Sequence, residues 1–90
     1  MRVGEVRVHR APAHQRRRGL LAWLSAEVDG WVLDGFALRV TRDGRPYVVI
    51  PKRRDSEGRL HAWFLPVDQR NRDELEDAIL GAIDLEALTR

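Results

Sequence analysis

Residues 20–41 read LLAWLSAEVDGWVLDGFALRVT, and this stretch decides the fold. It contains two apolar runs, Leu20–Val28 and Trp31–Thr41, which are separated only by the pair Asp29-Gly30. Both positions of that pair tolerate positive φ, so it is a strong signal for a two-residue hairpin turn. The centre of the chain is therefore predicted to be two antiparallel strands.

Further strands are predicted on both sides of this hairpin. Val3–Arg10 alternates apolar and polar side chains, with an offset near Gly4 that indicates a bulge. Tyr47–Ile50, opened by Pro46, is a fourth strand, and Arg59–Val67 is a fifth. The sequence thus predicts an antiparallel sheet of four to five strands.

Three interruptions shape this sheet. Asp34-Gly35 within the third strand indicates a bend or bulge, because glycine permits a close backbone approach. Ala11–Arg18 carries a proline and three consecutive arginines without apolar periodicity, so we expect a solvated connection there. Lys52–Gly58 is expected to be a charged turn that follows Pro51.

The pattern changes from period 2 to period 3.6 after Pro66, which predicts one C-terminal helix. The stripe that would face the core comprises Leu75, Ala78, Ile79, Ala82 and Ile83. The helix begins either after Asp68 or at Asn71, which has Glu74 three residues later, and we expect an acid-rich first turn. Gly81 indicates either a close approach of another backbone or a helix that weakens beyond residue 84. The predicted class is α+β, as a single domain over residues 1–90.

Length and composition limit the classes of protein that this chain can belong to. Ninety residues bury a thin core, and small domains often gain further stability by forming oligomers, so a dimer has to be considered. There is no cysteine, which excludes disulfides, thiolate metal sites and a thiol nucleophile and fits a reducing compartment. No segment has the length and apolar character of a signal peptide or membrane span, so we expect a cytoplasmic protein without a membrane partner.

The sequence favours a binding module over an enzyme. Its histidines are His9, His14 and His61, and no two of them have helical metal-ligand spacing, so no metal site is expected. Asp55 and Glu57 resemble an acid and base pair only superficially, because the arginines that flank them favour the ionised form of a carboxylate.

Charge is distributed unevenly along the chain, although the formal net charge is only +2. Residues 1–18 carry six arginines against one glutamate, and residues 42–59 carry six cations against three acids. Residues 68–90 instead carry seven acids against three arginines. Such a distribution indicates either an anionic ligand on the basic side or the attraction of two faces within a dimer.

A candidate phosphate-binding patch follows from this distribution. The turn after Pro51 holds four cations, and two more arginines lie at the start of the predicted helix. If the sheet brings both places onto one surface, they can neutralise phosphates and release counterions. The predicted contacts are Lys52, Arg53, Arg54, Arg70 and Arg72. The alternative is a solvated hairpin whose charges serve solubility.

The second half of the chain resembles a known family. The motif YVVIPKRRDSEG at residues 47–58 is followed by Pro66-Val67, by Arg72, and by Leu75 with the run Asp77-Ala78-Ile79-Leu80. These features occur in the order typical of the SpoVG family, the stage V sporulation protein G or septation regulator of bacteria. Residues 3–10 and 31–36 also resemble that family, which has histidine where this chain has Leu65 and a basic residue where it has Glu74.

The resemblance implies an antiparallel sheet with a C-terminal helix, assembled as a homodimer without a cofactor. It also implies binding to DNA and RNA and a role in regulating gene expression, sporulation or septation. The alternative from a different class is a non-enzymatic structural or protein-interaction dimer, in which the basic and acidic regions pair across subunits.

Overall fold

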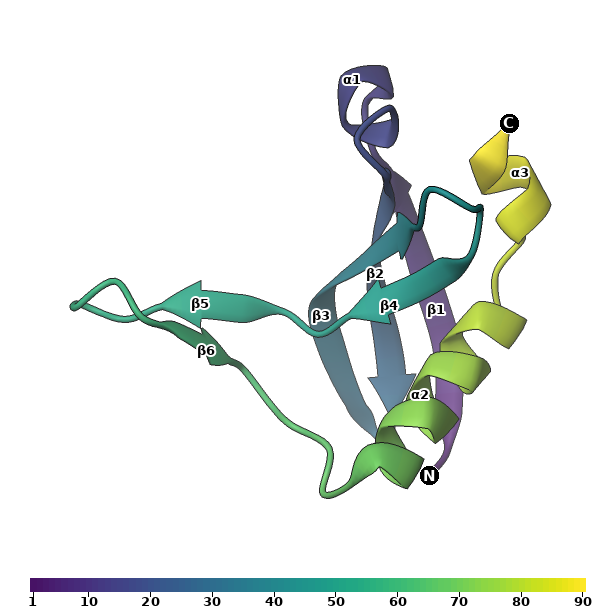
Figure 1. Cartoon of the computed structure of the whole chain (residues 1–90). Coiled ribbons are helices and arrows are strands. Elements are labelled where there is room, and N and C mark those ends of the chain that lie inside the picture. The colour runs from purple at the N-terminus through teal and green to yellow at the C-terminus, as the bar shows by residue number, and fades with distance from the viewer.

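The computed structural model describes all 90 residues and confirms the α+β class. The main antiparallel sheet has the order β1-β2-β3-β4, formed by β1 (Val3–Arg10), β2 (Leu20–Val28), β3 (Trp31–Val40) and β4 (Pro46–Val49) (Figure 1). A separate two-stranded sheet consists of β5 (Lys52–Arg54) and β6 (Leu60–Ala62). The helices are α1 (Ala13–Arg16), α2 (Gln69–Gly81) and α3 (Leu85–Thr89).

The central hairpin forms as predicted. Asp29 and Gly30 both adopt positive φ, at 50° and 84°, and Val28 pairs with Trp31 directly across the turn. The bulge near Gly4 is confirmed by a register shift between Val3 and Val6. These turns place each strand beside its neighbour in the sequence, which gives the sheet its simple order.

The predicted irregularity in β3 is also confirmed. It lies beside Pro51, after which the chain leaves the main sheet. Leu24 pairs with Phe36 and Ser25 with Asp34, so Gly35 is an extra, unpaired residue. Its φ is 86°, and a Cβ at this position would lie 3.3 Å from the Cβ of Pro51. Glycine is therefore required for both backbone conformation and space beside Pro51.

One face of the main sheet packs against α2 and α3 and forms the core. The largest fully buried side chains are Phe36, Leu24, Leu38, Ile79 and Val48. Leu75 and Leu88 join them from α2 and α3, and no charged or polar side chain is buried. Because side chains alternate along a strand, the neighbouring residues Trp23, Ala37 and Val49 lie on the opposite side, here called the open face.

The C-terminal region differs from the single helix that the sequence predicts. Asp68 is the N-cap, and its carboxylate accepts a hydrogen bond from the backbone N–H of Asn71. The expected acid-rich first turn is wrong, because with this cap the first turn is Gln69–Arg72 and contains no acid. The helix ends at Gly81. A Cβ added to this residue would meet no atom within 4 Å, so a close approach of another backbone does not explain the glycine. A second helix, α3, follows with Asp84 as its cap.

Two further expectations are wrong. Arg59–Val67 does not add a fifth strand to the main sheet, because only Leu60–Ala62 is extended and it pairs with β5 (Figure 1). The chain then turns back, and Phe64 packs edge-on against Phe36 with ring centroids 5.5 Å apart. The segment Ala11–Arg18, expected to be only a solvated connection, contains α1.

None of the helices combines the length and apolar character needed to cross a bilayer.

Introducing a carboxylate at Ile79 tests how α2 packs on the sheet. Ile79 is fully buried, so Ile79→Asp must place a charge, or a neutralised acid, in an apolar core. We expect the free energy of unfolding to fall by about 3 to 5 kcal/mol, measured by denaturant titration. The matched control is Gln69→Asp on the exposed first turn of the same helix, where a change within about 0.5 kcal/mol is expected. Equal stability of the two variants would contradict this packing.

Candidate nucleic-acid interface

The basic segment after Pro51 forms a projecting hairpin rather than a turn. β5 and β6 pair antiparallel, with Lys52 opposite Ala62 and Arg54 opposite Leu60. Residues 52–62, here called the arm, extend away from the main sheet and from both C-terminal helices (Figure 1). The cations that the sequence places in one turn therefore lie along a two-stranded ribbon open to solvent.

The tip of the arm is organised around one carboxylate. Asp55 accepts hydrogen bonds from the backbone N–H groups of Glu57 and Arg59, each at 2.9 Å. Its other oxygen lies 2.8 Å from Nε2 of His61. The hydrogen bond from His61 and those from the Arg59 and Glu57 backbones lower the pKa of Asp55 below its ordinary value. Asp55 thus holds the ends of β5 and β6 together.

Three cations of the arm have no acidic partner. Lys52, Arg53 and Arg54 are exposed and form no ion pair, although Arg54 donates a hydrogen bond to the carbonyl oxygen of Gly58 at 2.7 Å. Arg59, by contrast, is paired with Asp55 and Glu57. The unpaired cations therefore lie along β5 and not in the turn at residues 55–59.

Arg53 also contacts an aromatic ring. Its guanidinium carbon lies 5.3 Å from the centroid of the Trp63 ring, a distance typical of a cation–π interaction. Successive side chains of a strand point to opposite faces, so Arg53 and the pair Lys52 and Arg54 occupy different faces of the ribbon. A ligand can thus meet cations on either side of the arm.

The structure does not bring the two predicted halves of the basic site together. Arg70 and Arg72 lie in the first turn of α2 on the body, whereas the arm points away from that helix (Figure 1). Arg70 is exposed, but Arg72 donates a hydrogen bond to the carbonyl oxygen of Val48 at 2.7 Å and lies 3.6 Å from the carboxylate of Glu76. The convergence of these arginines with Lys52, Arg53 and Arg54 is absent within one copy of the chain.

Arg72 instead helps to cover the free edge of the sheet. Glu76 accepts a hydrogen bond from the backbone N–H of Val48 at 2.9 Å, while Arg72 bonds the carbonyl of the same residue. The two side chains, one helical turn apart, satisfy the outward-facing backbone groups of β4 at this point. Such coverage protects an edge strand from pairing with another chain.

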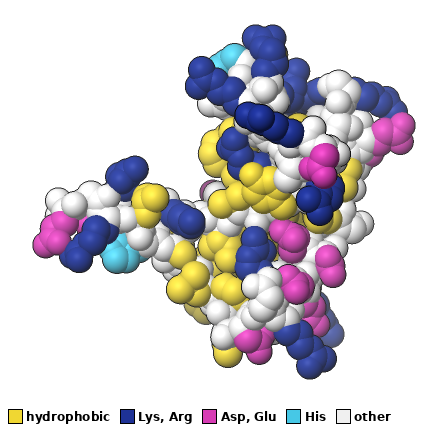
Figure 2. Space-filling view, in the orientation of Figure 1, with side chains coloured by type: hydrophobic (Ala, Val, Ile, Leu, Met, Phe, Trp, Pro, Cys, Tyr) yellow, Lys and Arg dark blue, Asp and Glu magenta, His cyan; other side chains and the backbone are white.

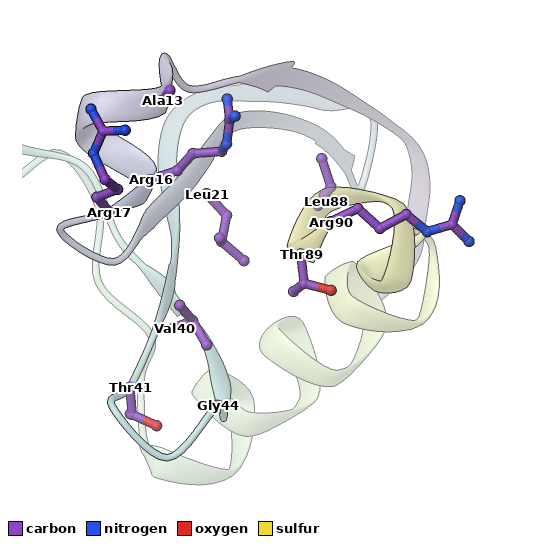
Figure 3. A pocket seen from close by; sticks show the side chains of 10 residues that line it. All are labelled: Ala13, Arg16, Arg17, Leu21, Val40, Thr41, Gly44, Leu88, Thr89 and Arg90. Atoms are coloured by element: carbon purple, nitrogen blue, oxygen red, sulfur yellow. The ribbon is translucent and has the colours of Figure 1, made fainter.

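A second basic surface lies at the end of the sheet near α1 and α3, and the sequence indicated only part of it. A cavity of about 580 Å³ opens between α1, the β3–β4 turn and α3. Figure 3 shows Leu21 and Val40 pointing into the gap, with the guanidinium groups of Arg17 and Arg90 on opposite sides of it. The run of three arginines at residues 16–18 was the available signal, but the proximity of Arg90 arises only from the tertiary fold.

The remaining titratable side chains do not cluster as metal ligands. No three histidine, aspartate or glutamate side chains are arranged to hold a metal ion. Of the three histidines, His61 is hydrogen-bonded to Asp55 in the arm.

Comparisons of the chain with family models, curated proteins and solved structures found no match.

The pKa of Asp55 provides a test of the arm. Because the pKa of Asp55 is lower in the folded arm than in the unfolded chain, the ionised carboxylate stabilises the arm. This stabilisation is fully present above the ordinary pKa of 3.8 and is lost as pH falls through the lower pKa of the folded arm. We expect the amide NMR signals of Glu57 and Arg59 to move together with a midpoint below pH 3.8.

Asp55→Asn is the control, because it should remove this transition while leaving the signals of the main sheet unchanged. A midpoint at or above pH 3.8 in the parent protein would contradict the described network.

Proposed function

We propose that this chain is a nucleic-acid-binding regulatory protein of the SpoVG type. It binds DNA or RNA, without a catalytic step or a cofactor, and acts in the regulation of gene expression, sporulation or septation. The observation that carries this proposal is the arm, where Lys52, Arg53 and Arg54 are exposed, free of carboxylates and held on a ribbon that projects from the body. The resemblance of residues 47–80 to the SpoVG family supports the same function.

The arm acts mainly through the phosphate backbone. Lysine and arginine side chains that neutralise phosphates release condensed counterions, and this contribution is independent of sequence. With about three phosphate contacts, the slope of log affinity against log salt on duplex DNA is expected to be about −3. Arg70 lies too far from the arm to join the same contact in one copy, as Figure 1 shows for the start of α2.

A homodimer strengthens this mode of binding. Two arms attached to one body double the number of phosphate contacts, and the second arm binds at a high effective concentration. The expected salt slope then approaches about −5.

Exposed apolar side chains offer a surface for this dimer. Trp31, Val32, Leu65 and Val67 are between 67% and 93% exposed, which is unusual for large hydrophobic residues. A cavity of about 750 Å³, lined by Trp31, Val32, Trp63 and Phe64 among others, lies where the arm joins the body. Figure 2 shows hydrophobic side chains gathered at this junction. A second copy that covered Trp31, Val32, Leu65 and Val67 would leave Trp63 and the cations of β5 free.

A second candidate function is favoured by the charge of α2. Asp73, Glu74 and Asp77 are exposed and form no ion pair, and they lie away from the arm of the same copy. In a protein-interaction or structural dimer, these acids would pair with the arm of the partner. The arm would then be neutralised and unable to bind nucleic acid, so the two functions exclude each other at this site.

Removing two cations of the arm tests the main proposal. We expect Arg53→Ala with Arg54→Ala to weaken binding to unrelated sequences about equally, and to flatten the salt slope by roughly one unit per lost contact. Fluorescence anisotropy at several salt concentrations measures both quantities. The fold should be retained, because exposed charges usually change stability by less than about 0.5 kcal/mol.

The matched control removes two arginines that already have acidic partners. Arg7 is paired with Glu5 and Arg45 with Asp43, so Arg7→Ala with Arg45→Ala lowers the net charge equally but should change affinity much less. If the arm variant keeps full affinity while folded, the arm is not the binding site. If the parent protein binds no nucleic acid at low salt, the second candidate function replaces the first.

The oligomeric state is a separate prediction. We expect light scattering at micromolar concentration to give about twice the monomer mass of 10.4 kDa, with little change at high salt. Trp31→Asp should shift the protein toward the monomer without loss of secondary structure, because Trp31 is 74% exposed. A dimer that dissociates at high salt, and is unaffected by Trp31→Asp, would instead indicate pairing between the arm and α2.

A further inference from the structure

A third cavity lies between the open face of the sheet and the base of the arm. This cavity of about 430 Å³ has Trp23 of β2 on one side and Trp63, which follows β6, on the other. Trp23 is 45% exposed and Trp63 is 62% exposed, so both indole rings are accessible. The open face thus has two aromatic surfaces at the border of a groove.

The strand register explains why a groove forms here. Trp23 pairs with Ala37, which in turn pairs with Val49, so these side chains form one row across the open face. The small side chain of Ala37 stands beside the large indole of Trp23 and leaves a depression. Neither α2 nor α3 covers this side, because both pack on the face that carries Phe36 and Leu38.

The charges around the groove all have the same sign. Arg39 and Lys52 are the only charged residues among those that line it, and no carboxylate is present. Arg53, on the other face of the ribbon, contacts the Trp63 ring but does not line the groove. The neighbouring cavity at the base of the arm, by contrast, includes Asp34. The groove therefore combines aromatic surfaces with positive charge alone, which suits a ligand that is both flat and anionic.

We propose that this groove binds single-stranded nucleic acid, with bases stacked on Trp23 and Trp63 and phosphates bound by Arg39 and Lys52. This inference rests on the proposed function and names its preferred substrate. Bases in a duplex are stacked on each other, whereas those of a single strand can turn out and stack on aromatic side chains. Stacking tolerates any base, so the groove adds affinity and strand selectivity without reading a sequence.

The groove and the arm form one continuous site, because Lys52 begins β5 and also lines the groove. A single strand that crosses the groove reaches the cations of the arm without leaving the surface. A duplex contacts the arm through its phosphates but cannot place a base against either tryptophan. The protein is therefore expected to bind single strands more tightly than duplexes of equal charge.

Replacing Trp23 tests the inference with probes of defined structure. The probes are a labelled single-stranded oligonucleotide, the same length of duplex, and an abasic strand with the same phosphates. We expect Trp23→Ala to lower affinity for the single strand by about 5- to 150-fold, to leave duplex and abasic binding nearly unchanged, and to leave the salt slope unaltered. Trp23→Phe, which keeps an aromatic face, should recover most of the loss.

Trp63→Ala is a second variant that keeps the test valid if Trp23→Ala disturbs the sheet. Trp63 lies outside both sheets and is largely exposed, so its replacement should leave the melting temperature close to that of the parent. The same selective loss for the single strand is expected, measured by anisotropy on protein whose fold is checked by circular dichroism.

Each alternative outcome has a distinct meaning. If both variants bind the single strand as the parent does, the stacking site is wrong, while the phosphate-binding function stands as long as the parent shows a steep salt slope. If the parent binds none of the three probes at low salt, the proposed function itself fails. If Trp23→Ala converts a dimer into a monomer in light scattering, the groove is a protein interface and the inference is overturned.

Discussion

The contact between α2 and one face of the sheet is the constraint on which the other features depend. Ile79 and Leu75 pack against side chains from β2, β3 and β4, and this is the only extensive apolar layer that 90 residues provide. The opposite face therefore remains largely uncovered, with only the small cluster around Ala11 and Leu20 to shield it. Both the exposed tryptophans and the free arm follow from having a single covering layer.

That same helix determines which arginines remain available to a ligand. Its position over β4 lets Arg72 and Glu76 bond the backbone of Val48, so Arg72 serves the edge of the sheet. The arm leaves the sheet just beyond this point, after Pro51, and takes Lys52, Arg53 and Arg54 with it. The two sets of cations look alike in the sequence, but the fold turns Arg72 into a structural arginine and leaves Lys52, Arg53, Arg54 and Arg70 facing solvent.

The sequence predicts the parts of the fold that a local pattern determines. Alternating side chains and the Asp29-Gly30 turn place β1 to β4, and the extra residue at Gly35 is found where a glycine interrupts the third strand. β5 was missed because its three residues are all cationic and face solvent on both sides, so no apolar alternation marks them. α1 has only four residues, which is too short for a helical period to be visible.

The candidate site could be predicted only in part for a related reason. Exposed cations can be recognised from composition, and Lys52, Arg53 and Arg54 are exposed as expected. Whether Arg72 joins them depends on a contact with Val48, 24 residues away, and a single sequence does not reveal such a contact. The groove beside Trp23 likewise exists only through the register of three strands.

Gly35 lies directly beside Pro51, the residue after which the arm leaves the body. At about 3.3 Å per extended residue, the tip at Ser56 lies roughly 16 Å from Pro51. A rotation of about 10° at this pivot would move the tip by about 3 Å, close to the roughly 3.4 Å between successive nucleotides of one strand. A side chain at position 35 would lie 3.3 Å from the Cβ of Pro51, so Pro51 would have to move by a few tenths of an ångström, and any rotation at this point is magnified along the arm. In the proposed dimer, a side chain at position 35 would therefore change the distance between the tips of the two arms.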